Sequence, residues 1–254
     1  MIDFLFSLYH TVLFEPLFNT LVILYNLVPG QDFGIAVILV TLLVRFAFAP
    51  LSAKAVVAQR KLMALQPQAK EIQERFKKDR DRQAKELLEL YKREKVNPLA
   101  GILPILIQIP FLIALYQVFW KGLGVEQLEF LYSFVTNPGL IDPTFLGMVN
   151  LGEQSLIMAA IAAAFQFIQG KQMAQKRKPE DQKSFAATFQ KQALYFFPIL
   201  TLLIVSQLPS AVGLYWITTS VFSIVQHRYV TRNEKISVNP IKQGEVGGQI
   251  QNAK

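Results

Sequence analysis

The 254-residue chain is 52% hydrophobic and 17% charged, contains 20 Phe and no Cys, and has a formal net charge of +8. This composition is typical of an all-α polytopic membrane protein and excludes one large soluble domain. The lack of cysteine excludes disulfide bonds and thiolate metal sites.

Residues 1–32 contain an apolar stretch, 13–29, that polar side chains interrupt. These side chains are Glu15, Pro16, Asn19 and Asn26. No cluster of positive charge precedes the stretch and no small-residue cleavage site follows it. We therefore predict an external, interfacial amphipathic helix rather than a signal peptide. The alternative is an additional spanning helix.

Five further apolar stretches are predicted to span the membrane and to form a five-helix transmembrane core. They cover residues 33–52, 99–121, 153–170, 193–208 and 211–229. The apolar parts of the last three are about 15–16 residues long, or roughly 22–24 Å at the helical rise. Because the usual hydrocarbon core is about 30 Å thick, we expect the bilayer to be thinned beside them.

The basic residues are concentrated in three segments of the chain, namely 53–98, 171–192 and the part from 228 onward. On the opposite side of the predicted spans, Lys121 is the one basic residue of the sequence, among several acidic ones. The positive-inside rule then places the N-terminus outside and the C-terminus in the cytoplasm. It accounts for the net charge without a nucleic-acid partner, and contact of the loops with ribosomal RNA stays open.

The first basic segment, 53–98, is predicted to form a cytoplasmic helical hairpin. Its first arm carries a heptad-like seam of Ala58, Leu62, Leu65, Ala69, Ile72 and Phe76. Its second arm continues the apolar face with Ala84, Leu87, Leu88 and Tyr91. Pro67 should bend the first arm. The outer loop 122–152 is expected to form turns, 171–192 a cytoplasmic loop, and 230–254 a disordered cytoplasmic tail.

The sequence shows no pattern of an enzyme. His10 and His227 are its two histidines, and no catalytic triad, zinc-protease motif or nucleotide-binding loop is visible. The predicted spans contain almost no acidic residues, which argues against a transporter that relays protons. We therefore expect no catalytic residues, no metal and no cofactor.

Arg45 is the most unusual residue of the predicted spans, because a guanidinium stays charged and is costly to place in hydrocarbon. Thr41 and Ser52 lie on the same helical stripe. Polar side chains also follow helical spacing on the other predicted spans. If these faces meet, they form a hydrated, positively charged substrate groove together with Arg45. The candidate groove residues are Thr41, Arg45, Gln108, Gln166, Gln207, Tyr215, Thr219 and Ser223. Two alternatives stay open, namely that Arg45 snorkels to the interface and that the polar stripes only join helices.

Three separate stretches resemble the YidC membrane protein insertase family, which has relatives in mitochondrial and thylakoid membranes. They are "LVRFAFAPLS" at 43–52, "YKREKVNPLAGILPILIQIPFLIALY" at 91–116 and "PSAVGLYWITTSVFSIVQ" at 209–226. They occur in the family's order, and the resemblance covers about residues 13–232. It implies a five-helix core whose hydrophilic groove opens to the cytoplasm and the lipid but is closed on the outer side.

The resemblance also implies roles for particular residues. The family's groove arginine matches Arg45, and the threonine one turn earlier matches Thr41. The glutamine of its second span matches Gln108, and an aromatic residue of its last span matches Tyr215. The family's hairpin, which recruits substrate or ribosome, matches residues 53–95. The chain shows neither a large periplasmic domain nor a lipoprotein cysteine, so we expect a small five-span bacterial member. The alternative is an organellar homologue without its transit peptide.

We therefore expect a membrane protein insertase that moves nascent hydrophobic segments and short polar tails from the cytoplasm into the bilayer. The alternatives are a channel or small-solute transporter with an intramembrane arginine, and a scaffold whose hairpin only recruits partners. The expected partners are nascent clients, membrane lipid, the ribosome, signal-recognition machinery and the Sec translocon. The expected location is the bacterial plasma (inner) membrane, with the monomer as the working form.

Overall fold

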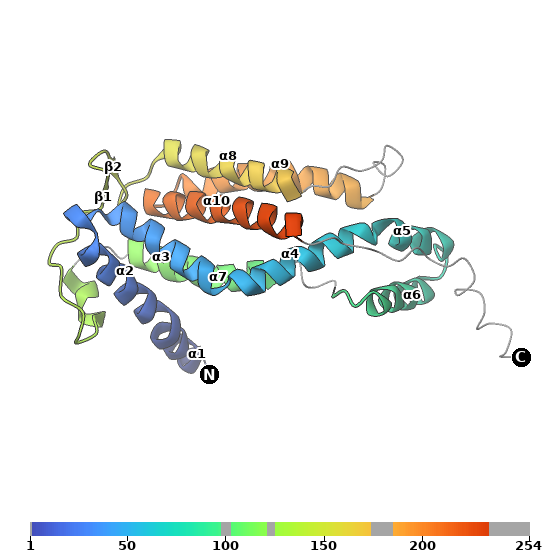
Figure 1. Ribbon diagram of the computed structural model, residues 1–254, viewed down its shortest axis with the longest axis horizontal. Coiled ribbons are helices and arrows are strands. Elements are labelled where there is room, and N and C mark those ends of the chain that lie inside the picture. The colour runs from blue at the N-terminus through green and yellow to red at the C-terminus, as the bar shows by residue number, and fades with distance from the viewer. Residues whose placement is uncertain (1, 98–102, 121–124, 174–184, 234–254) are drawn as a thin grey trace, which may run out of the picture.

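The computed structural model describes residues 2–97, 103–120, 125–173 and 185–233, and it is mostly helical, as predicted (Figure 1). Its elements, in chain order, are α1 (Ile2–Tyr9), the π-helical turn η1 (His10–Phe14), α2 (Glu15–Leu27), the 3-10 turn η2 (Pro29–Gln31), α3 (Phe33–Ala47), α4 (Ala49–Ala64), α5 (Gln66–Arg75), α6 (Arg80–Arg93), α7 (Leu103–Trp120), the 3-10 helix η4 (Val125–Phe130), β1 (Thr144–Phe145), β2 (Val149–Asn150), α8 (Leu156–Met173), α9 (Phe185–Val205) and α10 (Ser210–Asn233).

The five-span core is not established by the length and composition of the described helices. One helix, Ser7–Leu27, is long and apolar enough to cross a membrane by itself. The bent pair Phe33–Ala47 and Ala49–Ala64 is a second candidate if it forms one broken span. Because Ser7–Leu27 overlaps the stretch predicted to be interfacial, the spanning alternative for this stretch stays open.

The predicted span 33–52 is two helices rather than one. α3 and α4 meet at an angle of 64°, and Phe48 between them has φ −92° and ψ 1°, outside the helical region. Pro50 lies in the first turn of α4. Proline has no N–H to donate and its ring clashes with the preceding turn, so a continuous helix is disfavoured here.

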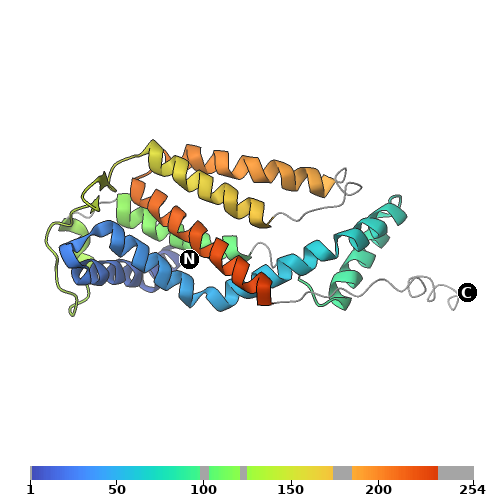
Figure 2. The same cartoon turned by 45° about the horizontal axis from the view of Figure 1, so that its top comes forward.

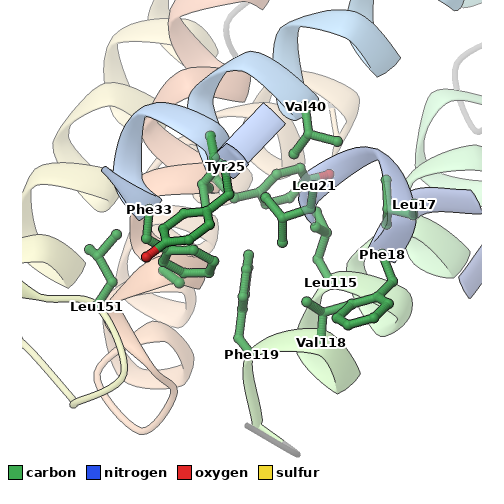
Figure 3. Packing of buried hydrophobic residues seen from close by; sticks show 14 of the residues in the cluster. Leu17, Phe18, Leu21, Tyr25, Phe33, Val40, Leu115, Val118, Phe119 and Leu151 are labelled. Carbon is green, nitrogen blue, oxygen red and sulfur yellow. The ribbon is translucent and has the colours of Figure 1, made fainter. Parts of the chain in front are cut away.

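The largest buried core joins α2, α3 and α7 and extends to α10 (Figure 3). Phe18 and Val40 are completely buried, and the rings of Phe33 and Phe119 meet edge to face with their centroids 5.8 Å apart. α8 packs between α9 and α10, since it contacts both (Figure 2). This core holds α3 in register against α10, and the functional candidates lie on that pair.

Residues 125–155, which precede α8, cover the end of the bundle opposite to the hairpin (Figure 1). They contain a two-stranded antiparallel sheet in which Thr144 pairs with Asn150. Asp32 attaches this sheet to the start of α3, because its carboxylate accepts hydrogen bonds from the backbone N–H of Ile35 (2.9 Å) and of Leu146 (2.6 Å). The same carboxylate therefore caps α3 and fixes the loop.

The helices α4, α5 and α6 form an arm that extends away from the bundle (Figure 2). Leu65, Ala69, Leu90 and Val96 make a small buried core in this arm, with Leu62, Ile72, Leu87 and Tyr91 packed around it. The first arm breaks at Leu65 and Pro67 lies in the first turn of α5, where proline is tolerated. The core differs from the predicted seam in the second arm, since Leu90 is buried whereas Ala84 and Leu88 are exposed. In the first arm, Ala58 and Phe76 are only half-buried and lie outside this core.

Candidate functional site

The structure brings three of the predicted groove residues together in a seam between α3 and α10, which we call the arginine seam. Arg45 lies in the last turn of α3, and its Nε donates a hydrogen bond to Oγ1 of Thr219 at 3.4 Å. Tyr215, one turn earlier on α10, is 5% exposed, and its phenol neighbours both of these side chains. Arg45 itself is only half buried.

The position of Arg45 follows from the break in the helix. α3 ends at Ala47, so the guanidinium lies within one turn of the bend at Phe48. A helix C-terminus carries a partial negative charge that favours a cation. Neither α3 nor α10 contains an acidic residue. The helix terminus and the hydroxyl groups of α10 therefore make a polar setting for a permanent positive charge.

Thr41 lies one turn before Arg45 but is buried, with 1% of its surface exposed. Its hydroxyl donates to the backbone carbonyl of Val37 at 2.6 Å. The hydroxyl hydrogen is therefore used inside α3. Thr41 supports the arginine seam from within and does not form part of its open surface.

A hydrogen-bonded pair, Ser52 and Gln226, lies at the other end of the seam. The sequence placed Ser52 on the stripe of Arg45 but did not predict this pairing. Ser52 on α4 donates to Oε1 of Gln226 at 2.9 Å, and Nε2 of Gln226 donates to the carbonyl of Ala49 at 2.8 Å. Ser223 donates to the carbonyl of Thr219 at 2.9 Å. The bonds of Gln226 tie α10 to α4, and the bond between Arg45 and Thr219 ties α10 to α3, so α10 is attached on both sides of the bend at Phe48.

Gln166 belongs to a separate polar junction of α8, α9 and α10. Its Oε1 accepts hydrogen bonds from Nε1 of Trp216 at 2.8 Å and from the hydroxyl of Thr201. Trp216 is next to Tyr215 in sequence, so it points away from the arginine seam on α10. Sequence reasoning missed Thr201 and Trp216, because each appeared as a single polar atom in an apolar helix.

The two remaining predicted groove residues are Gln207 and Gln108. Gln207 is exposed in the turn between α9 and α10, and its backbone carbonyl accepts a hydrogen bond from the side chain of Gln154 at 3.0 Å. It therefore lies beyond the end of α9 that is remote from the seam. The backbone of Gln108 lies in α7, but its side chain is outside the described residues.

Helix α9 presents an exposed apolar surface on the outside of the bundle. Large side chains of this helix that are more than about one-third exposed are Tyr195, Phe196, Phe197, Ile199, Leu200, Leu203 and Ile204. A contiguous exposed apolar surface of this kind is typical of contact with lipid or with another protein. Within the described part of the chain, no group of three His, Cys, Asp or Glu side chains could hold a metal ion.

The fold and the site define a helical protein with a cationic polar seam between two of its helices. Residues 23–237 match the family described as 60Kd inner membrane protein. The chain therefore belongs to this family of YidC-type membrane protein insertases, as the sequence motifs predicted.

Two relatives are proteins named membrane protein insertase YidC. The chain is 35% identical to the one from Francisella philomiragia over 202 residues, which are 80% of this chain and 33% of that protein. It is also 35% identical to the one from Francisella tularensis subsp. novicida over 202 residues, with the same two coverages. The chain thus spans about a third of the length of the curated relatives it matches.

Proposed function

We propose that this protein is a membrane protein insertase that receives nascent segments from the cytoplasm at the arginine seam. The observation that carries this proposal is the half-buried Arg45 beside the hydroxyl groups of Thr219 and Tyr215. A charge at this depth is costly unless polar groups and water reach it. Such a site favours transient entry of polar chain, especially an acidic tail.

The proposed mechanism needs no covalent chemistry. The polar tail of a client enters the seam, where Arg45 attracts acidic residues, while the client's apolar segment moves into lipid beside the exposed surface of α9. Burial of that segment supplies the main driving force. A membrane potential that is negative inside adds about 2.3 kcal/mol per acidic residue per 100 mV as the tail moves outward.

The proposed topology has the N-terminus outside and the hairpin of α4, α5 and α6 in the cytoplasm of a bacterial inner membrane. The exposed charged surface of the hairpin suits recruitment of nascent clients. The ribosome, signal-recognition machinery and the Sec translocon remain proposed partners, and the monomer is the proposed working form. Membrane lipid is the surrounding partner in each case.

Reconstitution of the purified chain into vesicles separates the proposed function from its main rival, a channel or small-solute transporter with an intramembrane arginine. Proteoliposomes that contain only this protein should insert a small client with one apolar helix and an acidic tail, measured by protection of the tail from protease. Empty vesicles are the control. Vesicles that conduct anions but leave the client digestible would overturn the insertase proposal in favour of the rival.

The access of water to the seam gives a further prediction, and the cysteine-free sequence makes it simple to test. A Thr219→Cys variant should react with a membrane-impermeant thiol reagent added from the cytoplasmic side and not from the outer side. Met148→Cys in the outer loop, where Met148 is 79% exposed, is the matched control and should react from the outer side only. Labelling of Thr219→Cys from both sides would indicate a through-pore.

A further inference from the structure

A cavity lies at the base of the hairpin, away from the arginine seam. It has a volume of about 410 Å³ and is formed by α4, the residues after α6 and the end of α10. Small-molecule sites in proteins occupy about 300–1,000 Å³. The proposed insertase function does not use this cavity.

Three lysines line the cavity over an apolar floor. Lys54 and Lys61 lie seven residues apart on one face of α4, with Val57 between them, and Lys95 enters from the end of α6. Val96 and Val230 contribute buried parts of the wall, with 6% and 8% of their surfaces exposed. Among the described residues, none of these three ammonium groups is in an ion pair. The cavity therefore presents concentrated positive charge beside apolar surface.

The backbone of Lys95 is unusual in a way that points to a role for its side chain. Its φ is +52°, in the left-handed region. The N–H of Val96 bonds to the carbonyl of Tyr91, and that of Lys95 to the carbonyl of Lys92, which is the hydrogen-bond pattern of a Schellman helix end. Glycine is the favoured residue at this position. A lysine in a position that suits glycine is better explained by its ammonium group than by the turn.

The end of α10 places the cavity at a membrane boundary. Tyr229 forms one wall, is 71% exposed and is the last residue of the predicted span 211–229. Tyrosine is enriched at the level of the lipid headgroups. No histidine and no carboxylate is among the described residues that line the cavity, whereas three lysines and three valines are. A phosphate with an attached hydrocarbon chain matches both parts of this lining.

We propose that this cavity binds the headgroup phosphate of an anionic phospholipid from the cytoplasmic leaflet. Basic pockets on the cytoplasmic side of membrane helices are suited to such headgroups. The side of the membrane follows from the proposed function, whereas the binding chemistry does not depend on insertion. Because the wall is shared by α4, Lys95 and α10, a bound lipid holds the base of the hairpin against the end of α10.

Native mass spectrometry of the full chain in neutral detergent tests the proposal without any client. Phosphatidylglycerol should bind on the order of a hundredfold more tightly than phosphatidylcholine, since each lysine near an anionic lipid contributes about fivefold. The Lys54→Gln/Lys61→Gln variant should lose about twentyfold to thirtyfold of this preference. Lys95→Gly should lose about fivefold while its unfolding temperature stays the same or rises, because glycine relieves the left-handed backbone.

Lys77→Gln/Lys78→Gln is the matched control, since it removes the same charge from the exposed turn after α5. This control should keep the preference for phosphatidylglycerol, and an equal loss in both double variants would overturn the proposal. Inorganic phosphate at millimolar concentration should fail to displace the lipid. Full displacement by inorganic phosphate would assign the cavity to a soluble anion and overturn the lipid proposal. Failure of the insertion assay alone would leave this result intact.

Discussion

Replacing Arg45 by alanine is expected to reduce insertion of an acidic-tailed client by about tenfold to a hundredfold in reconstituted vesicles. Hydrogen bonds to a charged group are worth about 1.5–3 kcal/mol, which corresponds to this range. Arg45→Lys keeps a positive charge at the same place at neutral pH and should retain most of the activity. The measurement is the initial rate of client protection from protease at fixed protein density.

The client supplies the sharpest control for this prediction. A client whose tail carries Asn in place of Asp should be affected much less by Arg45→Ala, because the attraction between charges is then absent. Thr219→Val removes the hydroxyl that accepts from Nε of Arg45 at 3.4 Å but keeps the charge, so its loss should stay below about fivefold. Equal losses for alanine and lysine at position 45, with either client, would contradict a role for charge.

The arginine seam could be predicted from the sequence because its members follow helical periodicity on elements of clear type. Arg45 was conspicuous as a charge in an apolar stretch, and Tyr215, Thr219 and Ser223 repeat every four residues on α10. The contact between Arg45 and Thr219 joins residues 174 positions apart. Periodicity identifies the face of each helix, and it does not by itself identify which faces meet.

For two other predicted groove residues, helical spacing alone did not give the position of the side chain. Gln166 has the spacing expected of a lining residue, yet its amide oxygen joins three helices through Trp216 and Thr201. A polar stripe predicts interhelical bonding and a wet lining equally well. Gln207 was assigned to a helical face, but α9 ends at Val205. Helical spacing does not tell where a side chain lies once the helix has ended. Helix ends are the least certain part of a sequence-based prediction.

The bend at Phe48 had a local signal in the sequence that periodicity ignores, whereas the cavity beside Lys95 had none. Pro50 predicts a boundary two residues before itself, but the apolar content of residues 33–52 favoured one span. The left-handed conformation of Lys95 could not be predicted from the sequence, because the residue that normally indicates such a helix end is glycine. Such features depend on how the chain closes on itself and appear only in the folded structure.

The outer end of the bundle must stay closed if the seam admits polar chain only from the cytoplasm. Asn19 on α2 is central to this closure, because it is 1% exposed and joins three backbone groups. Its Nδ2 donates to the carbonyls of Glu15 at 2.8 Å and Phe130 at 2.9 Å, and its Oδ1 accepts from the N–H of Tyr132 at 2.7 Å. The side chain thus fixes η4 and the following turn against the apolar core.

Replacing Asn19 by leucine is expected to lower the free energy of unfolding by about 2–4 kcal/mol. Leucine has a similar shape but removes the partner of two half-buried groups, the carbonyl of Phe130 and the N–H of Tyr132. Each costs about 1–2 kcal/mol, the lower part of the range for an unsatisfied polar group. The measurement is denaturant unfolding in detergent. Asn26→Leu on the same helix is the matched control, because Asn26 makes a single exposed bond to the carbonyl of Thr136 at 2.7 Å and should cost less than about 1 kcal/mol.

The same pair of variants tests whether the loop seals the outer side. In vesicles, Asn19→Leu should allow the outer-side thiol reagent to reach a Thr219→Cys residue, whereas Asn26→Leu should not. The reason is that the outer loop loses its buried anchor only in the first variant, so that water gains a second entrance to the seam. Protection of Thr219→Cys in both variants, together with similar unfolding free energies, would show that the packing of Phe18, Phe33 and Phe119 closes the outer end without Asn19.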